Sequence, residues 1–211
     1  SDILNTFPDN LLERFGVNEP ILLEEILSAC SDVTEDAVYR RIRSALARGA
    51  LVKKQRGVYF LPAREGATPD DISDESVLVR KYLSCGDEVY GYVVGDALRR
   101  EVGLPAQDDS VIEIVTNREK SRCRSIGAHA GYRDVVLRAS RVKVRAGNVD
   151  ALQALDLLTA LDLQALIDAD RARLSAFLSR VPAGSLLHSA RYFPAKTSKK
   201  LLEAEALGLL G

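Results

Sequence analysis

The chain has 211 residues, 46% of them hydrophobic, which is enough for real cores and leaves room for more than one domain. Its formal net charge is −1, so the total charge does not indicate a nucleic-acid binder. There is no run of about 18 apolar residues and no basic opening with an apolar stretch, so we expect no membrane segment and no secretory signal. The three cysteines, Cys30, Cys85 and Cys123, are far apart and lack metal-binding spacing. We therefore expect a cytoplasmic protein with reduced thiols and no cofactor.

Charge is distributed unevenly along the chain. Residues 1–33 carry seven acids and one base, whereas residues 34–60 carry seven bases and two acids. A second basic block, residues 118–145, has nine bases and two acids. Phosphate binding depends on local rather than total charge, so both blocks are candidates for contact with a polyanion.

Two helices are expected near the start of the chain. Apolar residues at helical spacing predict the first over 20–30, with Pro20 in its first turn. After a short turn at 31–33, Thr34 suits an N-cap because its hydroxyl accepts a hydrogen bond from a free backbone N–H. The second helix is amphipathic. Its apolar stripe contains Val38, Ile42, Ala45 and Leu46.

Two short strands, 51–54 and 58–61, are expected next, joined by a turn in which Gly57 takes a positive φ. Helix, short turn, helix and basic hairpin is the order of a winged helix–turn–helix, whose second helix enters the major groove of DNA. We predict that Arg40 and Arg43 reach base edges or phosphates and that the hairpin contacts phosphates. The candidate DNA-binding residues are Thr34, Tyr39, Arg40, Arg43, Lys53, Lys54 and Arg56.

Two alternatives to DNA binding fit the same pattern. Arginines on an exposed helix face are commonly just solvated, and winged domains also bind proteins. Tyr39 sits at the edge of the apolar stripe, so it either contacts DNA or packs at the helix margin.

Residues 62–71 are rich in proline, glycine and acids and have no apolar period, which is typical of a linker. We predict an α+β chain with a winged helix–turn–helix over 1–62, a linker over 63–73 and a mixed α/β domain over 74–211. The later domain is expected to end in several helices, near 148–158, 163–179, 184–192 and 197–207. Helices are also expected over 76–84 and 92–102, and strands over 111–116, 132–137 and 141–145.

Bases alternate in part with valines in the last two of these strands. In a half-buried sheet this pattern places the bases on one face. The candidate second basic surface contains Arg133, Arg138, Arg141, Lys143 and Arg145. It either binds DNA or RNA phosphates or is a solvated face balanced by acids elsewhere.

No catalytic site is predicted, and we expect neither an enzyme nor a metal site. The glycines at 91 and 95 lack the Lys-Ser or Lys-Thr of a phosphate loop. His129 and His188 have no metal-binding or triad spacing. Glu113 alternates with two isoleucines on a predicted strand and so faces solvent, which leaves a metal-dependent nuclease as a minor alternative.

An ordered series of segments resembles the AbiEi-type antitoxins of type IV toxin–antitoxin (abortive infection) systems. The segments are GVYFLP (57–62), YGYVVG (90–95), GLPAQ (103–107), VIEIVTN (111–117) and NVDALQALDLL (148–158). The resemblance covers roughly residues 10–160 and rests on the order of the segments rather than on any one motif.

This resemblance implies a transcriptional autorepressor that binds double-stranded DNA at inverted repeats upstream of its own operon. It also implies an antitoxic role for the C-terminal domain against a nucleotidyltransferase-like toxin, without a stable complex between the two proteins. It does not identify individual antitoxic residues. The alternative is a protein-interaction module whose winged domain binds a partner protein without specific DNA recognition.

Overall fold

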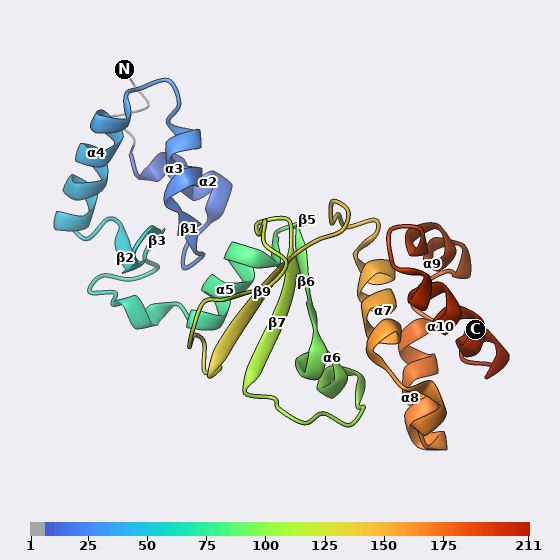
Figure 1. Cartoon of the computed structure of the whole chain (residues 1–211). Coiled ribbons are helices and arrows are strands. Elements are labelled where there is room, and N and C mark those ends of the chain that lie inside the picture. The colour runs from blue at the N-terminus through green and yellow to red at the C-terminus, as the bar shows by residue number, and fades with distance from the viewer. Residues whose placement is uncertain (1–6) are drawn as a thin grey trace. The chain divides into compact units, whose positions relative to one another are not determined.

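The computed structural model describes residues 7–211 as a mixed α+β chain (Figure 1). The chain divides into two compact units, Ser1–Lys81 and Tyr82–Gly211. The first unit extends past residue 62, because the predicted linker and most of the following helix fold back on it through contacts described below. Within the described residues, no helix combines the length and the apolar composition that a membrane crossing needs.

The first unit contains short helices and one small sheet. Its elements are η1 (Asp9–Leu11), α2 (Leu12–Phe15), β1 (Ile21–Leu22), α3 (Leu23–Ala29), α4 (Glu35–Ala47), β2 (Val52–Gln55), β3 (Val58–Phe60), η2 (Pro69–Asp71) and α5 (Asp74–Tyr82). The three strands form an antiparallel sheet in the order β1-β3-β2. The tight turn between β2 and β3 depends on Gly57, whose φ of 74° is in the left-handed region.

The helix predicted over 20–30 begins later than expected. Ile21 and Leu22 instead form β1 and pair with Tyr59 and Val58 of β3, and α3 starts at Leu23. The Glu25 carboxylate accepts a hydrogen bond from the Leu22 amide at 2.9 Å, which ties the end of the strand to the first turn of α3. The strand pairing overrides the local helical spacing.

The second unit combines a four-stranded sheet with a group of helices. Its elements are β4 (Ser84–Cys85), β5 (Glu88–Val89), β6 (Gly91–Val94), α6 (Gly95–Val102), β7 (Val111–Thr116), β8 (Arg124–Ser125), β9 (Asp134–Ala139), α7 (Val149–Ala160), η3 (Leu163–Ala165), α8 (Asp168–Leu178), α9 (Ala183–Ala190) and α10 (Ala195–Ala206). The sheet order is β6-β7-β9-β8, with β7 and β9 parallel and the other neighbours antiparallel.

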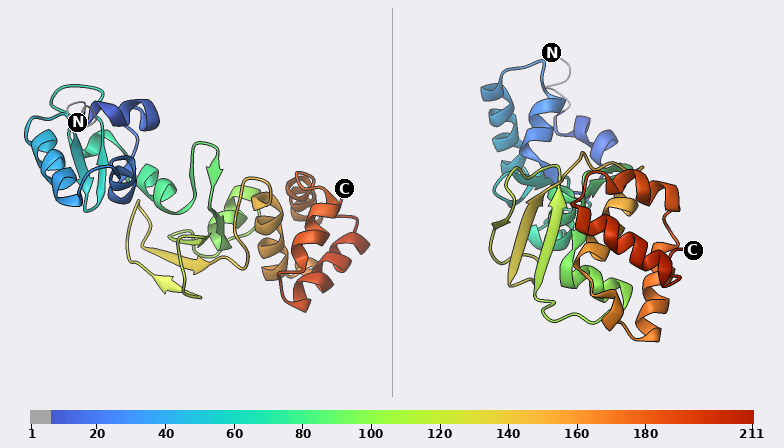
Figure 2. Two further views of the ribbon diagram at one scale, coloured as in Figure 1. Left: turned by 90° about the horizontal axis from the view of Figure 1, so that it is seen from above. Right: turned by 45° about the vertical axis from the view of Figure 1, so that its right-hand side comes forward.

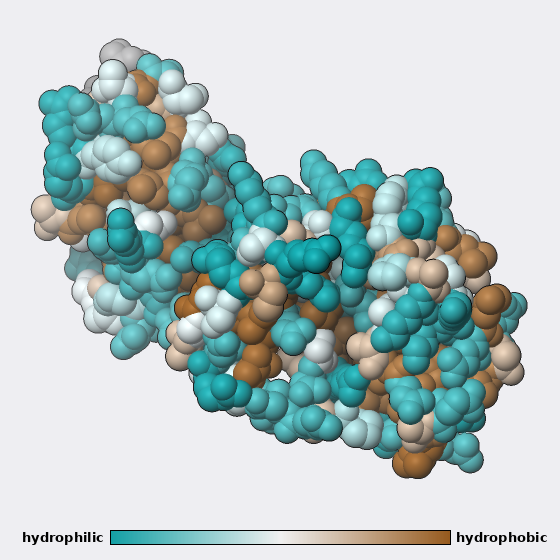
Figure 3. All heavy atoms as spheres, in the orientation of Figure 1, coloured by the Kyte–Doolittle hydropathy of each residue, from teal (hydrophilic) through white to brown (hydrophobic). Residues whose placement is uncertain are grey.

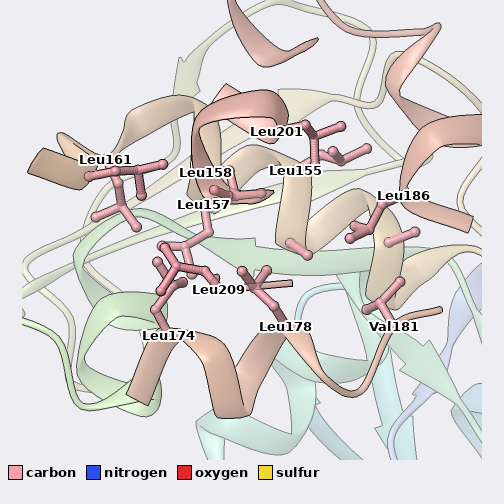
Figure 4. Packing of buried hydrophobic residues seen from close by; sticks show 14 of the residues in the cluster. Leu155, Leu157, Leu158, Leu161, Leu174, Leu178, Val181, Leu186, Leu201 and Leu209 are labelled. Carbon is pink, nitrogen blue, oxygen red and sulfur yellow. The ribbon is translucent and has the colours of Figure 1, made fainter. Parts of the chain in front are cut away.

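The helices α7 to α10 gather beside this sheet, as both views in Figure 2 show. Helix α7 is central to them, since most of its apolar residues are buried. Figure 4 shows Leu155 and Leu158 of α7 near Leu201 of α10, with Leu174 and Leu178 of α8 completing the cluster. Each of these leucines is at most 5% exposed, so this cluster is the main core of the second unit.

Two sequence predictions for the second unit are wrong. The helix expected over 92–102 starts only at Gly95, because residues 91–94 form β6 and pair with β7. The strand expected over 141–145 is a loop. Its backbone is satisfied by side chains instead of by a neighbouring strand: Asn117 both donates to the Val144 carbonyl, at 2.9 Å, and accepts from the Val144 amide, at 2.8 Å.

Candidate nucleic-acid interface

Helix α4 presents an unpaired basic face. The Thr34 hydroxyl accepts a hydrogen bond from the Ala37 amide at 3.3 Å, which caps the helix. Val38, Ile42 and Ala45 are buried in the core of the first unit. At 100° per residue, Arg40 and Arg43 lie on the opposite side of the helix, and both are exposed. Neither forms an ion pair with any residue that the structure describes.

The space-filling view shows hydrophilic side chains along the outer edge of the first unit, where α4 lies (Figure 3). Arg41 is a third exposed, unpaired base on the flank of this helix, and the sequence prediction missed it. A helical projection of residues 35–47 would have placed it beside the arginine face. Arg48 differs, because it donates to the Phe7 carbonyl at 2.9 Å and so holds the chain at the start of the described region.

The β2–β3 hairpin adds two further bases. Lys53 is exposed on β2, opposite Tyr59 of β3, and Arg56 is exposed in the turn. Neither forms an ion pair within residues 7–211. Both side chains are therefore available to a polyanion, as those of Arg40 and Arg43 are.

Lys54, unlike Lys53, is held by partners within the first unit, so it leaves the candidate interface. Its side chain is only 7% exposed. The ammonium donates to the carbonyls of Pro69 and Ile72, at 3.0 and 2.8 Å, and lies 3.1 Å from a carboxylate oxygen of Asp74. Lys54 holds the predicted linker against the first unit.

A second contact fixes helix α5 on the same unit. The guanidinium of Arg80 forms an ion pair with Glu25 at the start of α3, with Nε donating to Oε1 at 3.2 Å. Only 10% of the Arg80 side chain is exposed. The guanidinium also lies over the ring of Phe15, with 5.5 Å from Cζ to the ring centroid. Lys54 and Arg80 together explain why the first unit extends beyond the hairpin.

The two remaining candidates have local roles in the fold. The Thr34 hydroxyl is occupied by its capping hydrogen bond. Tyr39 is half-buried and packs against the core of the first unit. In the same core, the pKa of the Cys30 thiol is raised, chiefly by burial. This cysteine therefore stays protonated at neutral pH.

The five candidate bases of the second basic block do not lie together on strands of one sheet. Arg133 precedes β9 and binds Asp108 at 2.6 Å, whereas Arg138 lies on β9 and binds Asp156 at 2.9 Å. Arg141, Lys143 and Arg145 lie in the loop after β9, where the strand alternation that would align them is absent. The prediction that all five bases lie on one face of a sheet is therefore wrong, because residues 141–145 are not a strand.

No catalytic constellation is evident in the part of the chain that the structure describes. These residues contain no group of three or more His, Cys, Asp or Glu side chains that could hold a metal ion. The carboxyl group of Glu113 lies beside Gly95, at the first turn of α6. The positive end of the helix dipole stabilises a negative charge at this position. Glu113 thus has a role in the fold. His129 is half-buried, and His188 lies 3.1 Å from Arg191.

Comparison with protein-family models, with curated proteins and with solved structures finds no match to this chain. The resemblance of five segments to AbiEi-type antitoxins therefore remains a prediction. The function has to be inferred from the geometry and the charge of the chain's own residues.

Proposed function

We propose that the first unit is a winged helix–turn–helix that binds double-stranded DNA through α4 and the β2–β3 hairpin. The order α2, β1, α3, α4, β2, β3, with β1 closing the sheet beside β3, supports the winged topology. In such modules the second helix of the pair enters the major groove and the hairpin lies over the backbone. Besides Arg41 on the flank of α4, four exposed bases on these two elements form no ion pair within residues 7–211, and this observation carries the proposal. They are Arg40, Arg43, Lys53 and Arg56.

The dimensions and the chemistry suit this role. Helix α4 has 13 residues and is therefore about 20 Å long, and an α-helix with its side chains is about 10–12 Å across, which fits a major groove about 12 Å wide. A guanidinium can donate two hydrogen bonds to O6 and N7 of a guanine, so Arg40 and Arg43 are the candidates for reading sequence. Lys53 and Arg56 would hold phosphates and set the position of the helix.

We further propose that the chain is an AbiEi-type antitoxin that represses transcription of its own operon. Support for this step comes from the ordered segments named above, together with the basic winged module. The second unit would then counter a nucleotidyltransferase-like toxin without a stable complex. The competing function, a protein-interaction module without specific DNA recognition, uses the same surface and differs in its dependence on DNA sequence.

The test is a binding titration of the full chain on the duplex upstream of its reading frame and on a scrambled duplex, at several salt concentrations. We expect tighter binding to the upstream duplex and a steep loss of affinity with salt, because bound phosphates release counterions. Arg43→Ala should cost about 1–3 kcal/mol on the upstream duplex and much less on the scrambled one. Arg14→Ala, an exposed arginine of α2 outside the proposed interface, is the matched control.

Two results would reject parts of the proposal. Equal, weak binding to both duplexes would exclude sequence-specific recognition and favour the protein-interaction function. The antitoxin step has a separate readout, the growth of cells that express the candidate toxin, and it is rejected if this chain does not restore growth. If alanine at the four bases abolishes DNA binding but leaves growth rescue intact, repression and antitoxicity reside in different units, as proposed.

A further inference from the structure

A pocket of about 370 Å³ lies in the second unit where the parallel strands β7 and β9 end. Its floor is one row of side chains across three adjacent strands, because Tyr92 pairs with Val115 and Val115 pairs with Arg138. The rest of the lining comes from α7, from the β7–β8 loop, from the last residue of β9 and from the segment after it. These residues are Asp156, Arg122, Ala139, Ser140 and Arg141.

The single carboxylate of the pocket is already satisfied. Asp156 has only 10% of its side chain exposed, and its Oδ1 accepts a hydrogen bond from Arg138 at 2.9 Å. Its Oδ2 accepts from the hydroxyl of Tyr92. Burial, and then the charge of Asp156, raise the pKa of the Tyr92 phenol well above its ordinary value, so the phenol stays a donor. The charge of Arg138 is therefore balanced within the protein.

The other two arginines are not balanced. Arg122 and Arg141 are exposed, and neither forms an ion pair with any residue in the described range. The guanidinium of Arg141 lies over the ring of Phe193, 5.2 Å from its centroid, which restrains it at the rim of the pocket. Three arginines against one carboxylate leave the pocket with two uncompensated positive charges.

We propose that this pocket binds a phosphate monoester. A monoester has a charge of about −1.5 to −2 at neutral pH, which matches the two uncompensated arginines. Planar guanidinium groups donate pairs of hydrogen bonds to phosphate oxygens. The volume is near the lower end of the range of about 300–1,000 Å³ for small-molecule sites, so it suits a phosphorylated sugar or a nucleoside monophosphate. Arg122 and Arg141 hold the phosphate, and Arg138 and Tyr92 present a rigid floor.

The monoester can come from a free metabolite or from the 5′ end of a nucleic acid, and the test separates these sources. The probes are ribose 5-phosphate, ribose, and a short single-stranded oligonucleotide with either a 5′-phosphate or a 5′-hydroxyl. Each is titrated into the full chain by calorimetry at constant ionic strength. We expect binding of ribose 5-phosphate and none of ribose. A stronger response to the 5′-phosphorylated oligonucleotide than to ribose 5-phosphate would identify the nucleic-acid end as the source.

Variants locate the site. Arg122→Gln and Arg141→Gln should each weaken binding of ribose 5-phosphate by at least about tenfold, since each removes hydrogen bonds between charged groups. Lys143→Gln is the matched control, because Lys143 is exposed in the same loop but does not line the pocket. None of these three side chains forms an ion pair in the described structure, so folding should be retained.

Two outcomes would overturn the proposal. One is the absence of ribose 5-phosphate binding at millimolar concentration. The other is an equal effect of Arg141→Gln and Lys143→Gln, which would indicate general charge attraction instead of a pocket. A readout that needs no variant is hydrogen exchange of the wild-type chain, in which ribose 5-phosphate should slow exchange in residues 138–145 and leave α4 unchanged.

Discussion

Replacing Lys54 with methionine tests whether this lysine binds the linker or DNA. The ammonium donates to two backbone carbonyls of the segment after the hairpin and pairs with Asp74. Methionine keeps most of the aliphatic stem, so packing along the stem changes little while the charge and the donors are lost. Lys53→Met, one residue earlier on the exposed side of β2, is the matched control.

The magnitude follows from the partners that are lost. A hydrogen bond to a charged group contributes about 1.5–3 kcal/mol when its loss leaves the partner unsatisfied. Pro69 is exposed, so water can replace the ammonium at its carbonyl, whereas Ile72 is buried. The Asp74 side chain is 56% exposed, and an ion pair with such a group contributes at most about 1 kcal/mol. We therefore expect Lys54→Met to lower the free energy of local unfolding of residues 63–74 by about 2–3 kcal/mol.

Hydrogen exchange of the full chain measures this effect locally, without assuming that the two units unfold together. Protection of residues 63–74 should fall by between about 25-fold and 150-fold in Lys54→Met and should not change in Lys53→Met. The two variants should have the opposite pattern of effects on DNA binding. Lys53→Met should reduce the salt dependence of binding by about one phosphate contact, and Lys54→Met should leave it unchanged. Unaltered protection in Lys54→Met, together with a reduced salt dependence, would show that Lys54 faces DNA and that the reasoning is wrong.

Two further predictions concern the second unit. Gly91→Ala should disrupt its sheet, because an added Cβ would lie 2.0 Å from the Tyr82 carbonyl oxygen. An added Cβ at Gly147 meets nothing within 4 Å, so Gly147→Ala is the control. The melting temperature should fall strongly only in Gly91→Ala. Glu119 accepts a hydrogen bond from Arg124, which with neighbouring amides lowers the pKa of that carboxyl to about 2 from 4.5. A lowered folded-state pKa adds stability above pH 4.5 that disappears as the pH falls towards 2, so the stability difference between the wild type and Glu119→Gln should shrink over that range.

Helix α4 could be predicted from the sequence because everything that forms it is local. Its cap, its acidic first turn and its apolar stripe all lie within residues 34–47, and the structure has the helix at Glu35–Ala47. Strand β1 could not be predicted in the same way. Ile21 and Leu22 continue the helical spacing of the residues after them, and only their pairing with Tyr59 and Val58 makes them a strand. Such pairing depends on chain segments far apart in sequence, and local patterns do not contain it.

The prediction of a strand over 141–145, in the loop after β9, was wrong for a related reason. Its valines and bases alternate as a strand does, but a strand also needs a partner for its backbone. Asn117 and Asn148 supply that partner with their side-chain amides, to Val144 on one side and to Lys143 and Arg145 on the other. Asparagine is expected in turns for this ability to replace a backbone partner. The two asparagines were visible in the sequence, but their distance to the loop was not.

Charge counts located both basic blocks but did not show which bases are available. In the second block, Arg133 and Arg138 are paired with aspartates from other elements, and those aspartates are remote in the sequence. What remains after internal pairing is a smaller set, which includes Arg122 and Arg141 at one pocket. The same subtraction in the first unit removes Lys54 and keeps Lys53. A base is evidence for an external anion only once its internal partners are known, and this is why we propose two different anions, a duplex and a monoester, for two blocks that look alike in sequence.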